Sequence, residues 1–211
     1  MKPYRYLFFD MDGTLTDSAP GILGGARYAL GEMGRPVEED PSYYRFFIGP
    51  PLHDSFARYF EGEMIDEAVR VYRVYYEKQG KFENRVYDGV YEMLDRLAEA
   101  GYILAVATSK HRYFTAQILD HFDLTRRFRF ISAADDEVLK TKADVIRHAL
   151  ETLGASPDQV LMIGDRHHDL EGAAACGVDS MGVTYGYAEP HELDAATYLA
   201  ASPQGILRLL L

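Results

Sequence analysis

The segment Asp10–Thr14, with the sequence DMDGT, constrains this chain most, because it places two carboxylates directly after an apolar run. That run, residues 4–9, shows little alternation of polar and apolar side chains, which indicates a central parallel strand covered on both faces. Open α/β sheets bind ligands at the carboxyl ends of their strands. Two acidic groups held there repel one another unless a cation or a proton intervenes. The sequence therefore predicts a ligand site that begins at Asp10 and Asp12.

The composition limits the partners that such a site can have. A chain of 211 residues with 47% hydrophobic residues is long enough to bury a substantial core. The net charge of −11 argues against nucleic acids and anionic membranes as partners, because phosphate backbones require clustered Lys and Arg. The single cysteine, Cys176, excludes an internal disulfide. No signal pattern or run of about 18 apolar residues occurs, so we expect a soluble cytoplasmic protein.

The pattern of apolar residues differs between two parts of the chain. Residues 18–33 are expected to form a helix, and aromatic residues then recur with helical spacing up to residue 83, which predicts a small helical bundle. Later apolar runs predict strands at 103–107, 128–132, 160–163 and 179–184, with helices between them and the last strand closing the sheet. We therefore predict an α/β fold, a Rossmann-like parallel sheet with helices on both faces. Residues 1–16 and 85–211 would form this core, and residues 17–84 an inserted small α-helical domain.

Four motifs give the chain a family resemblance. The segment Asp10–Thr14 resembles motif I, D-x-D-G-T, of the phosphatase branch of the haloacid dehalogenase superfamily. Thr108 and Ser109, which follow the strand at 103–107, match motif II, and a lysine before a helix matches motif III. Gly164–Asp169 matches the G-D-x-x-x-D of motif IV. In this resemblance residues 17–84 correspond to the helical cap, and the protein is similar to phosphoglycolate phosphatase.

The resemblance implies a Mg²⁺-dependent phosphatase acting on a small phosphorylated metabolite. Asp10 would attack phosphorus and form an aspartyl-phosphate, and Asp12 would serve as the general acid and base. Mg²⁺ would be held by Asp10, Asp165 and the backbone carbonyl of Asp12, with Asp169 supporting the ion or its water ligands. Thr108, with Ser109 beside it, would bind the substrate phosphate.

Two lysines compete for the role of the motif III lysine. Lys142 lies four residues before Ile146, on the buried side of the expected helix. Counting without gaps against the K-P-x-P form of the motif favours Lys140 instead. We expect Lys142 to bind the phosphate together with Thr108 and Ser109, and we keep Lys140 as the alternative.

Other readings remain open at this stage. A phosphomutase of the β-phosphoglucomutase type would share the four motifs, although its cap signature is not found here, and a phosphonatase would need a cap lysine that residues 48–52 lack. A non-catalytic phosphate-binding protein is disfavoured because every motif residue is present. Residues 48–52 resemble a specificity element of the cap and could equally be a turn. His167 and His168 suggest a transition metal, but neighbouring side chains on a turn are expected to point apart.

Overall fold

The computed structural model describes residues 3–135 and 137–211 and divides the chain into two compact units. One unit combines the residues up to Thr16 with Val86–Leu211, and the other comprises Asp17–Arg85. Short strands β2 (Thr16–Asp17) and β3 (Arg85–Val86) pair where the chain passes from one unit to the other. Each unit has its own architecture, and we describe them separately.

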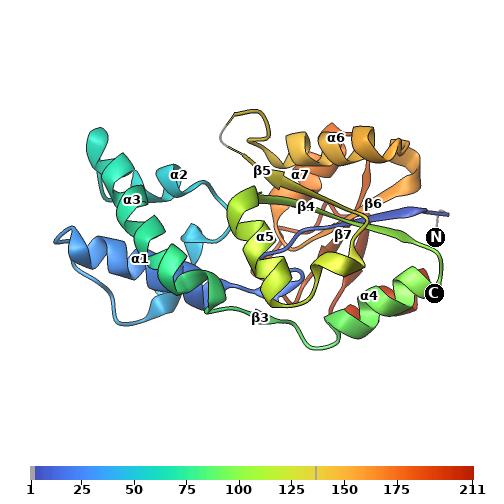
Figure 1. The fold of residues 1–211 in the computed structure, drawn as a ribbon, viewed down its shortest axis with the longest axis horizontal. Helices are drawn as coiled ribbons and strands as arrows, with labels where there is room; N and C mark the ends of the chain where they lie inside the picture. Colours follow the sequence, from blue (N-terminus) through green and yellow to red (C-terminus); the bar gives the residue numbers. More distant parts are fainter. Residues whose placement is uncertain (1–2, 136) are drawn as a thin grey trace. The chain divides into compact units, whose positions relative to one another are not determined.

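The first unit is built on a six-stranded parallel sheet with the strand order β5-β4-β1-β6-β7-β8 (Figure 1). Its strands are β1 (Tyr6–Phe9), β4 (Ile103–His111), β5 (Phe130–Ala134), β6 (Val160–Gly164), β7 (Asp179–Val183) and β8 (Tyr198–Ala200). The predicted α/β fold with a parallel sheet is confirmed.

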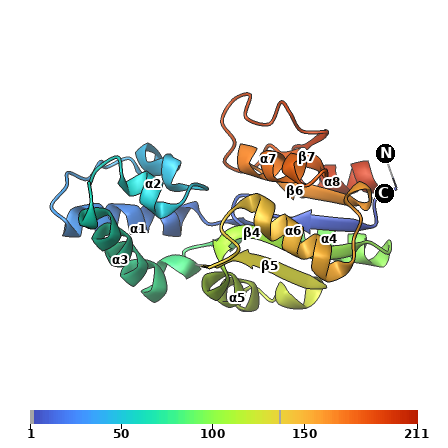
Figure 2. The same cartoon turned by 90° about the horizontal axis from the view of Figure 1, so that it is seen from above.

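Helices cover both faces of this sheet, which explains the continuous apolar run of β1. Leu7 and Phe9 pack into a cluster with α4 (Val90–Glu99), α5 (Arg112–His121) and α8 (Pro203–Leu210). Tyr6 and Phe8 pack on the opposite face with α6 (Lys142–Leu153) and α7 (His167–Ala175). Figures 1 and 2 show the two helical layers with the sheet between them. Each fully buried side chain of this kind stabilises the fold by about 1.5–3 kcal/mol.

Two sequence expectations about the sheet are wrong. The strand at 103–107 continues to His111, so Thr108 and Ser109 lie within β4 and not in a loop after it. The strand Asp179–Val183 does not close the sheet, because β8 pairs with it in register from Met181 and Tyr198. β8 has only three residues, too few for a recognisable alternation of polar and apolar side chains.

The second unit is helical. It contains α1 (Ala19–Glu32), η1 (Pro41–Phe47), α2 (Leu52–Phe56), α3 (Glu63–Lys78) and η2 (Gly80–Phe82). Its interior is aromatic, with Tyr44, Phe47, Phe56, Tyr72 and Tyr76 buried. The ring centroids of Phe47 and Phe56 lie 4.9 Å apart at an interplanar angle of 69°, an edge-on arrangement that aromatic pairs favour.

The segment from Ile48 to Leu52 connects η1 to α2 in this unit. Ile48 is buried, and Gly49 adopts a φ of 108°, which favours glycine. Pro51 then stands directly before the first residue of α2. These features account for the segment as a turn, and its predicted role in specificity stays a prediction.

Gly25 explains why α1 carries glycines that oppose helix formation. A Cβ atom on Gly25 would come within 2.7 Å of the Tyr72 ring, so the close approach of α1 and α3 requires a residue without a side chain here. The described helices include none that is long and apolar enough to cross a membrane.

We expect Gly25→Ala to lower the melting temperature, because the added methyl must displace the buried Tyr72 ring, at a cost of about 1–3 kcal/mol. Gly31→Ala in the same helix is the matched control. A Cβ there meets its nearest neighbour, Val37, at 3.6 Å, and helix propensity favours alanine by about 1 kcal/mol. Thermal unfolding followed by circular dichroism tests the pair, and equal effects of the two substitutions would contradict the packing argument.

Candidate active site

Three strands bring the site residues to one edge of the sheet. β1 lies between β4 and β6, with Phe9 paired to both Val106 and Ile163. The amide of Asp10 continues this register by donating a hydrogen bond to the carbonyl of Ile163 at 2.9 Å. Asp165 follows the last residue of β6, so it lies beside Asp10 although 155 positions separate them in the sequence. The strand ends thus assemble a site from distant parts of the chain.

Asp10, Asp165 and Asp169 form a compact acidic group. Each offers a carboxylate oxygen, and these oxygens all lie within 4.8 Å of one another. Asp165 and Asp169 are buried, and Asp10 is only 9% exposed. Asp169 belongs to the first turn of α7, where its carboxylate also accepts a hydrogen bond from the amide of Arg166 at 3.0 Å.

Lys142 supplies the positive charge in this group. Its Nζ lies 2.7 Å from Oδ1 of Asp10 and 2.8 Å from Oδ1 of Asp169, and it donates a hydrogen bond to the carbonyl of Ala107 at 3.1 Å. A capping box formed by Thr141 and Asp144 starts α6 directly at Lys142. This cap fixes the position from which the lysine side chain reaches the aspartates.

Lys140 lies outside the acidic group. Its side chain is exposed, and its backbone amide donates to the carboxylate of Asp144. The structure therefore brings Lys142, and not Lys140, next to the predicted nucleophile.

The charges of the group are unbalanced in a way that favours a cation. Burial raises the pKa of Asp10 to about 6, and Asp169 and Asp12 add to the increase while Lys142 opposes it. Burial, with the charges of Asp169 and Asp10, raises the pKa of Asp165 well above its ordinary value. For Lys142 burial acts to lower the pKa, but the two aspartates outweigh it and raise the pKa. One ammonium does not offset three carboxylates, so a divalent metal ion fits this set of oxygen donors.

Backbone groups pack closely around the carboxylate of Asp165. The carboxylate of Asp165 accepts a hydrogen bond from the amide of Tyr187 at 2.7 Å, and the hydroxyl of Thr14 lies 3.5 Å from its other oxygen. A Cβ atom on Gly13 would come within 2.0 Å of this carboxylate, and Gly13 has a φ of 79°. The glycine of the DMDGT segment is thus required both by its conformation and by the approach of Asp165.

The Asp12 side chain forms an ion pair with Lys110. Nζ of Lys110 lies 2.7 Å from Oδ2 of Asp12, and the two side chains are 9% and 19% exposed. None of the roles predicted from the sequence belongs to Lys110. The apolar run that predicts this strand ends at Ala107, so the sequence carried no signal that could have identified Lys110.

Thr108 and Ser109 differ in their surroundings. Thr108 is buried, and its Oγ1 accepts a hydrogen bond from the amide of Lys110 at 3.2 Å, which leaves its hydroxyl hydrogen for another acceptor. Ser109 is exposed. Of the two predicted phosphate-binding residues, Thr108 has the environment of a site residue.

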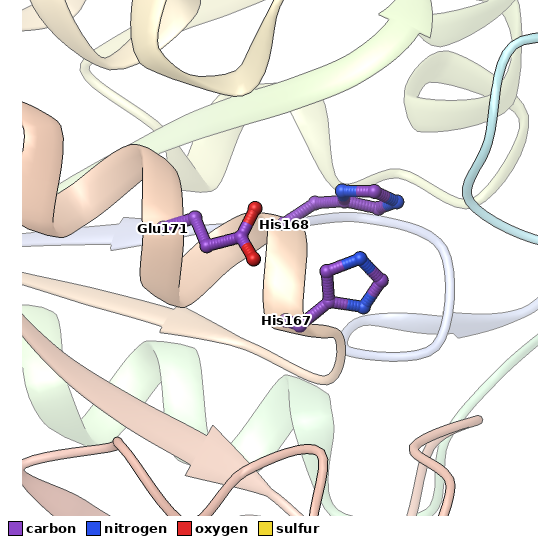
Figure 3. Close-up of side chains that lie close together, drawn as sticks. All are labelled: His167, His168 and Glu171. Carbon is purple, nitrogen blue, oxygen red and sulfur yellow. The ribbon is translucent and has the colours of Figure 1, made fainter.

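His167 and His168 do not point apart, contrary to the sequence expectation. They are the first two residues of α7, and their ring centroids lie 3.8 Å apart (Figure 3). Nδ1 of His167 lies 2.6 Å from Oε1 of Glu192. Burial, followed by the nearby His167 and Arg166, lowers the pKa of His168. The contact with Glu192 holds the His167 ring in this position, and the local sequence pattern does not indicate that contact.

Comparisons with known proteins agree with this geometry. The sequence model of the haloacid dehalogenase-like hydrolases matches residues 7–183, and the chain belongs to this family. The predicted family resemblance is therefore confirmed.

Several relatives cover most of the chain. A 5'-nucleotidase of Pseudomonas aeruginosa is 41% identical over 91% of this chain and 88% of its own length. A phosphoglycolate phosphatase of Nitrosospira multiformis is 32% identical over 90% of this chain and 88% of its own. The tyrosine-protein kinase PtkA of Mycobacterium tuberculosis is 40% identical over 90% of this chain, which spans only 65% of that relative.

A solved structure shows the same fold. The crystal structure of a predicted phosphatase from Clostridium acetobutylicum has a TM-score of 0.90 and 43% sequence identity to this chain, and the match covers 97% of this chain and 99% of the other.

Asp10→Asn is expected to change how the stability of the metal-free protein depends on pH. A folded-state pKa of about 6, above the usual 3.8, means that Asp10 stabilises the fold while protonated and loses this contribution as the pH rises from about 4 to about 6. The variant lacks this loss, so its stability relative to the wild type should rise across that window by about 3 kcal/mol. Urea unfolding in a chelator from pH 4 to pH 7 measures the difference, and a pH-independent difference would refute the assigned cause.

Proposed function

We propose that this protein is a Mg²⁺-dependent phosphatase that hydrolyses a small phosphate monoester through an aspartyl-phosphate on Asp10. The observation that carries the proposal is the position of Asp10 at the end of β1, 2.7 Å from Lys142 and grouped with Asp165 and Asp169. This arrangement supplies a carboxylate nucleophile, a fixed cation and a set of oxygen donors at one point.

In the first step, a carboxylate oxygen of Asp10 attacks the phosphorus atom in line with the ester oxygen. The P–O bond to the leaving group breaks, and Asp12 donates a proton to the departing alcohol. In the second step, Asp12 takes a proton from a water molecule that attacks the aspartyl-phosphate. Asp10 and inorganic phosphate are thereby released.

The lysine and the threonine hold the transferred phosphoryl group. Lys142 balances the charge of Asp10 and of the phosphoryl oxygens, and the hydroxyl of Thr108 orients one of those oxygens without adding charge. Ser109, the next residue along β4, would assist Thr108 in binding the phosphate. Lys110 directs Asp12, because its ammonium fixes the carboxylate from the neighbouring strand end.

Asp10 and Asp165, with the backbone of Asp12, would hold Mg²⁺, and Asp169 would support the ion or its water ligands. When bound, Mg²⁺ neutralises negative charge and lets an anionic substrate approach an anionic nucleophile. The all-oxygen donor set suits this ion better than a softer metal.

The names of the relatives support a small phosphorylated metabolite as the substrate, and they do not single out one compound. The relatives include a 5'-nucleotidase, a phosphoglycolate phosphatase and a pyrophosphatase, PpaX of Halalkalibacterium halodurans. We propose that Asp17–Arg85 acts as the cap and that its residues Ile48–Leu52 help to select the substrate. A panel of phosphorylated metabolites, including nucleoside monophosphates and phosphoglycolate, would rank the candidates.

Asp10→Asn is expected to abolish hydrolysis of p-nitrophenyl phosphate, because an amide cannot attack phosphorus, while its volume preserves the packing. The wild-type enzyme should release phosphate with Mg²⁺ and lose this activity in a chelator. Activity near the wild-type level in the variant would overturn the proposed nucleophile, and circular dichroism would show that the variant is folded.

Lys142→Ala is expected to lower kcat/KM by about a hundredfold or more, equivalent to about 2.7 kcal/mol of transition-state stabilisation. Lys140→Ala is the matched control and should have little effect, because its side chain is exposed and outside the acidic group. Steady-state kinetics on one substrate compare the two variants. The opposite order would transfer the role to Lys140.

Lys110→Met should slow the hydrolysis of alkyl phosphates by about tenfold or more, since a displaced Asp12 protonates the leaving alcohol poorly. Formation of the aspartyl-phosphate from p-nitrophenyl phosphate should slow much less, because nitrophenolate leaves without protonation. Single-turnover measurements on both substrates separate this step from hydrolysis of the intermediate. Equal slowing for both substrates would instead indicate that Lys110 contacts the phosphate.

A further inference from the structure

A second group of metal-binding side chains lies on the first turns of α7, apart from the buried aspartates. His167, His168 and Glu171 each offer a donor atom, and these atoms lie within 4.8 Å of one another. In Figure 3 the carboxylate of Glu171 is directed toward the two imidazole rings from the same helix. His167 and Glu171 are four residues apart and therefore share one helix face.

Glu192 sets the orientation of the His167 ring. Its Oε1 lies 2.6 Å from Nδ1 of His167 and accepts a hydrogen bond from the His167 amide at 2.9 Å. The Glu192 side chain is only 8% exposed, so it is a fixed partner. A carboxylate that accepts from Nδ1 places the proton there and leaves the lone pair on Nε2, as in carboxylate–histidine–metal arrangements.

The positive charges near this group are partly compensated. The guanidinium of Arg166 is paired with Glu192 at 2.6 Å, and Glu171 adds an exposed carboxylate. The positive end of the α7 dipole would repel a cation. However, the amides of Arg166 and His167 already donate to Asp169 and Glu192, which compensates part of that field.

We propose that His167, His168 and Glu171 form a site for a borderline divalent ion such as Zn²⁺, separate from the aspartate group. Imidazole and carboxylate donors suit Zn²⁺, Ni²⁺ and Cu²⁺, whereas Mg²⁺ prefers oxygen donors alone. Nitrogen donors on a tetrahedral Zn²⁺ at about 2.0–2.1 Å lie about 3.4 Å apart, so modest side-chain rotations suffice to close the site. The His167 side chain is 39% exposed, which leaves room for water to complete the coordination.

The test is calorimetric titration of Zn²⁺ into the 211-residue chain with Mg²⁺ in excess, so that the aspartate group is supplied with its preferred ion. We expect Zn²⁺ to bind, and we expect His167→Gln and Glu171→Gln each to weaken the affinity about tenfold or more. His191→Gln is the control. His191 is a histidine of the same unit whose side chain is 87% exposed, and it lies outside the group, so the affinity should not change.

A second measurement guards against variants that fold poorly. In the wild-type protein, Zn²⁺ should shift the ring-proton NMR signals of His167 and His168 and leave that of His191 in place. The proposal is overturned if excess Mg²⁺ prevents Zn²⁺ binding, if folded His167→Gln and Glu171→Gln variants bind Zn²⁺ as the wild type does, or if the two histidine signals do not move.

Discussion

The repulsion among three buried carboxylates is the constraint on which the rest of this site depends. The carboxylate oxygens of Asp10, Asp165 and Asp169 lie within 4.8 Å of one another. At this distance three ionised carboxylates repel one another strongly unless a cation is present. Lys142 offsets only part of this charge, and burial, together with the neighbouring carboxylates, raises the pKa values of Asp10 and Asp165. The group persists because the surrounding fold determines its geometry: parallel strands on both sides of β1 and a capped helix that starts at Lys142. A divalent ion bound to these oxygens would relieve the repulsion among them.

The sheet order explains why a site of a few residues draws on nearly the whole chain. β1 is central, and its neighbours β4 and β6 come from much later in the sequence. Both strands flank β1, so β4 contributes Thr108 and Lys110, and β6 leads directly into Asp165. The helical unit, Asp17–Arg85, is inserted in the sequence between β1 and β4. These two strands nevertheless pair directly with one another.

Much of the fold and the site could be predicted because the informative residues follow strongly apolar runs. Asp10 and Asp165 were identifiable in this way, and Lys142 was identifiable by its position relative to the buried face of α6. The pairing of Lys110 with Asp12 was not, because apolar character ends at Ala107 whereas β4 continues in polar residues to His111. Pairing with β5 determines that extension, and a partner strand cannot be recognised from local pattern alone. β8 was missed for the same reason, since its identity as a strand depends on β7.

The helical periodicity of α7 places its carboxylate and imidazole donors on different faces of the helix. Successive residues of a helix turn by about 100°, so Asp169 faces away from His167, whereas Glu171 returns to the His167 face. Asp169 is consequently buried with Lys142, and Glu171 is exposed. The carboxylate of Asp169 therefore lies in the buried acidic group, whereas the imidazole of His167 lies at the surface of α7. Since metal preference follows donor type, the two proposed sites on the first five residues of α7 would differ in selectivity without a change in the backbone.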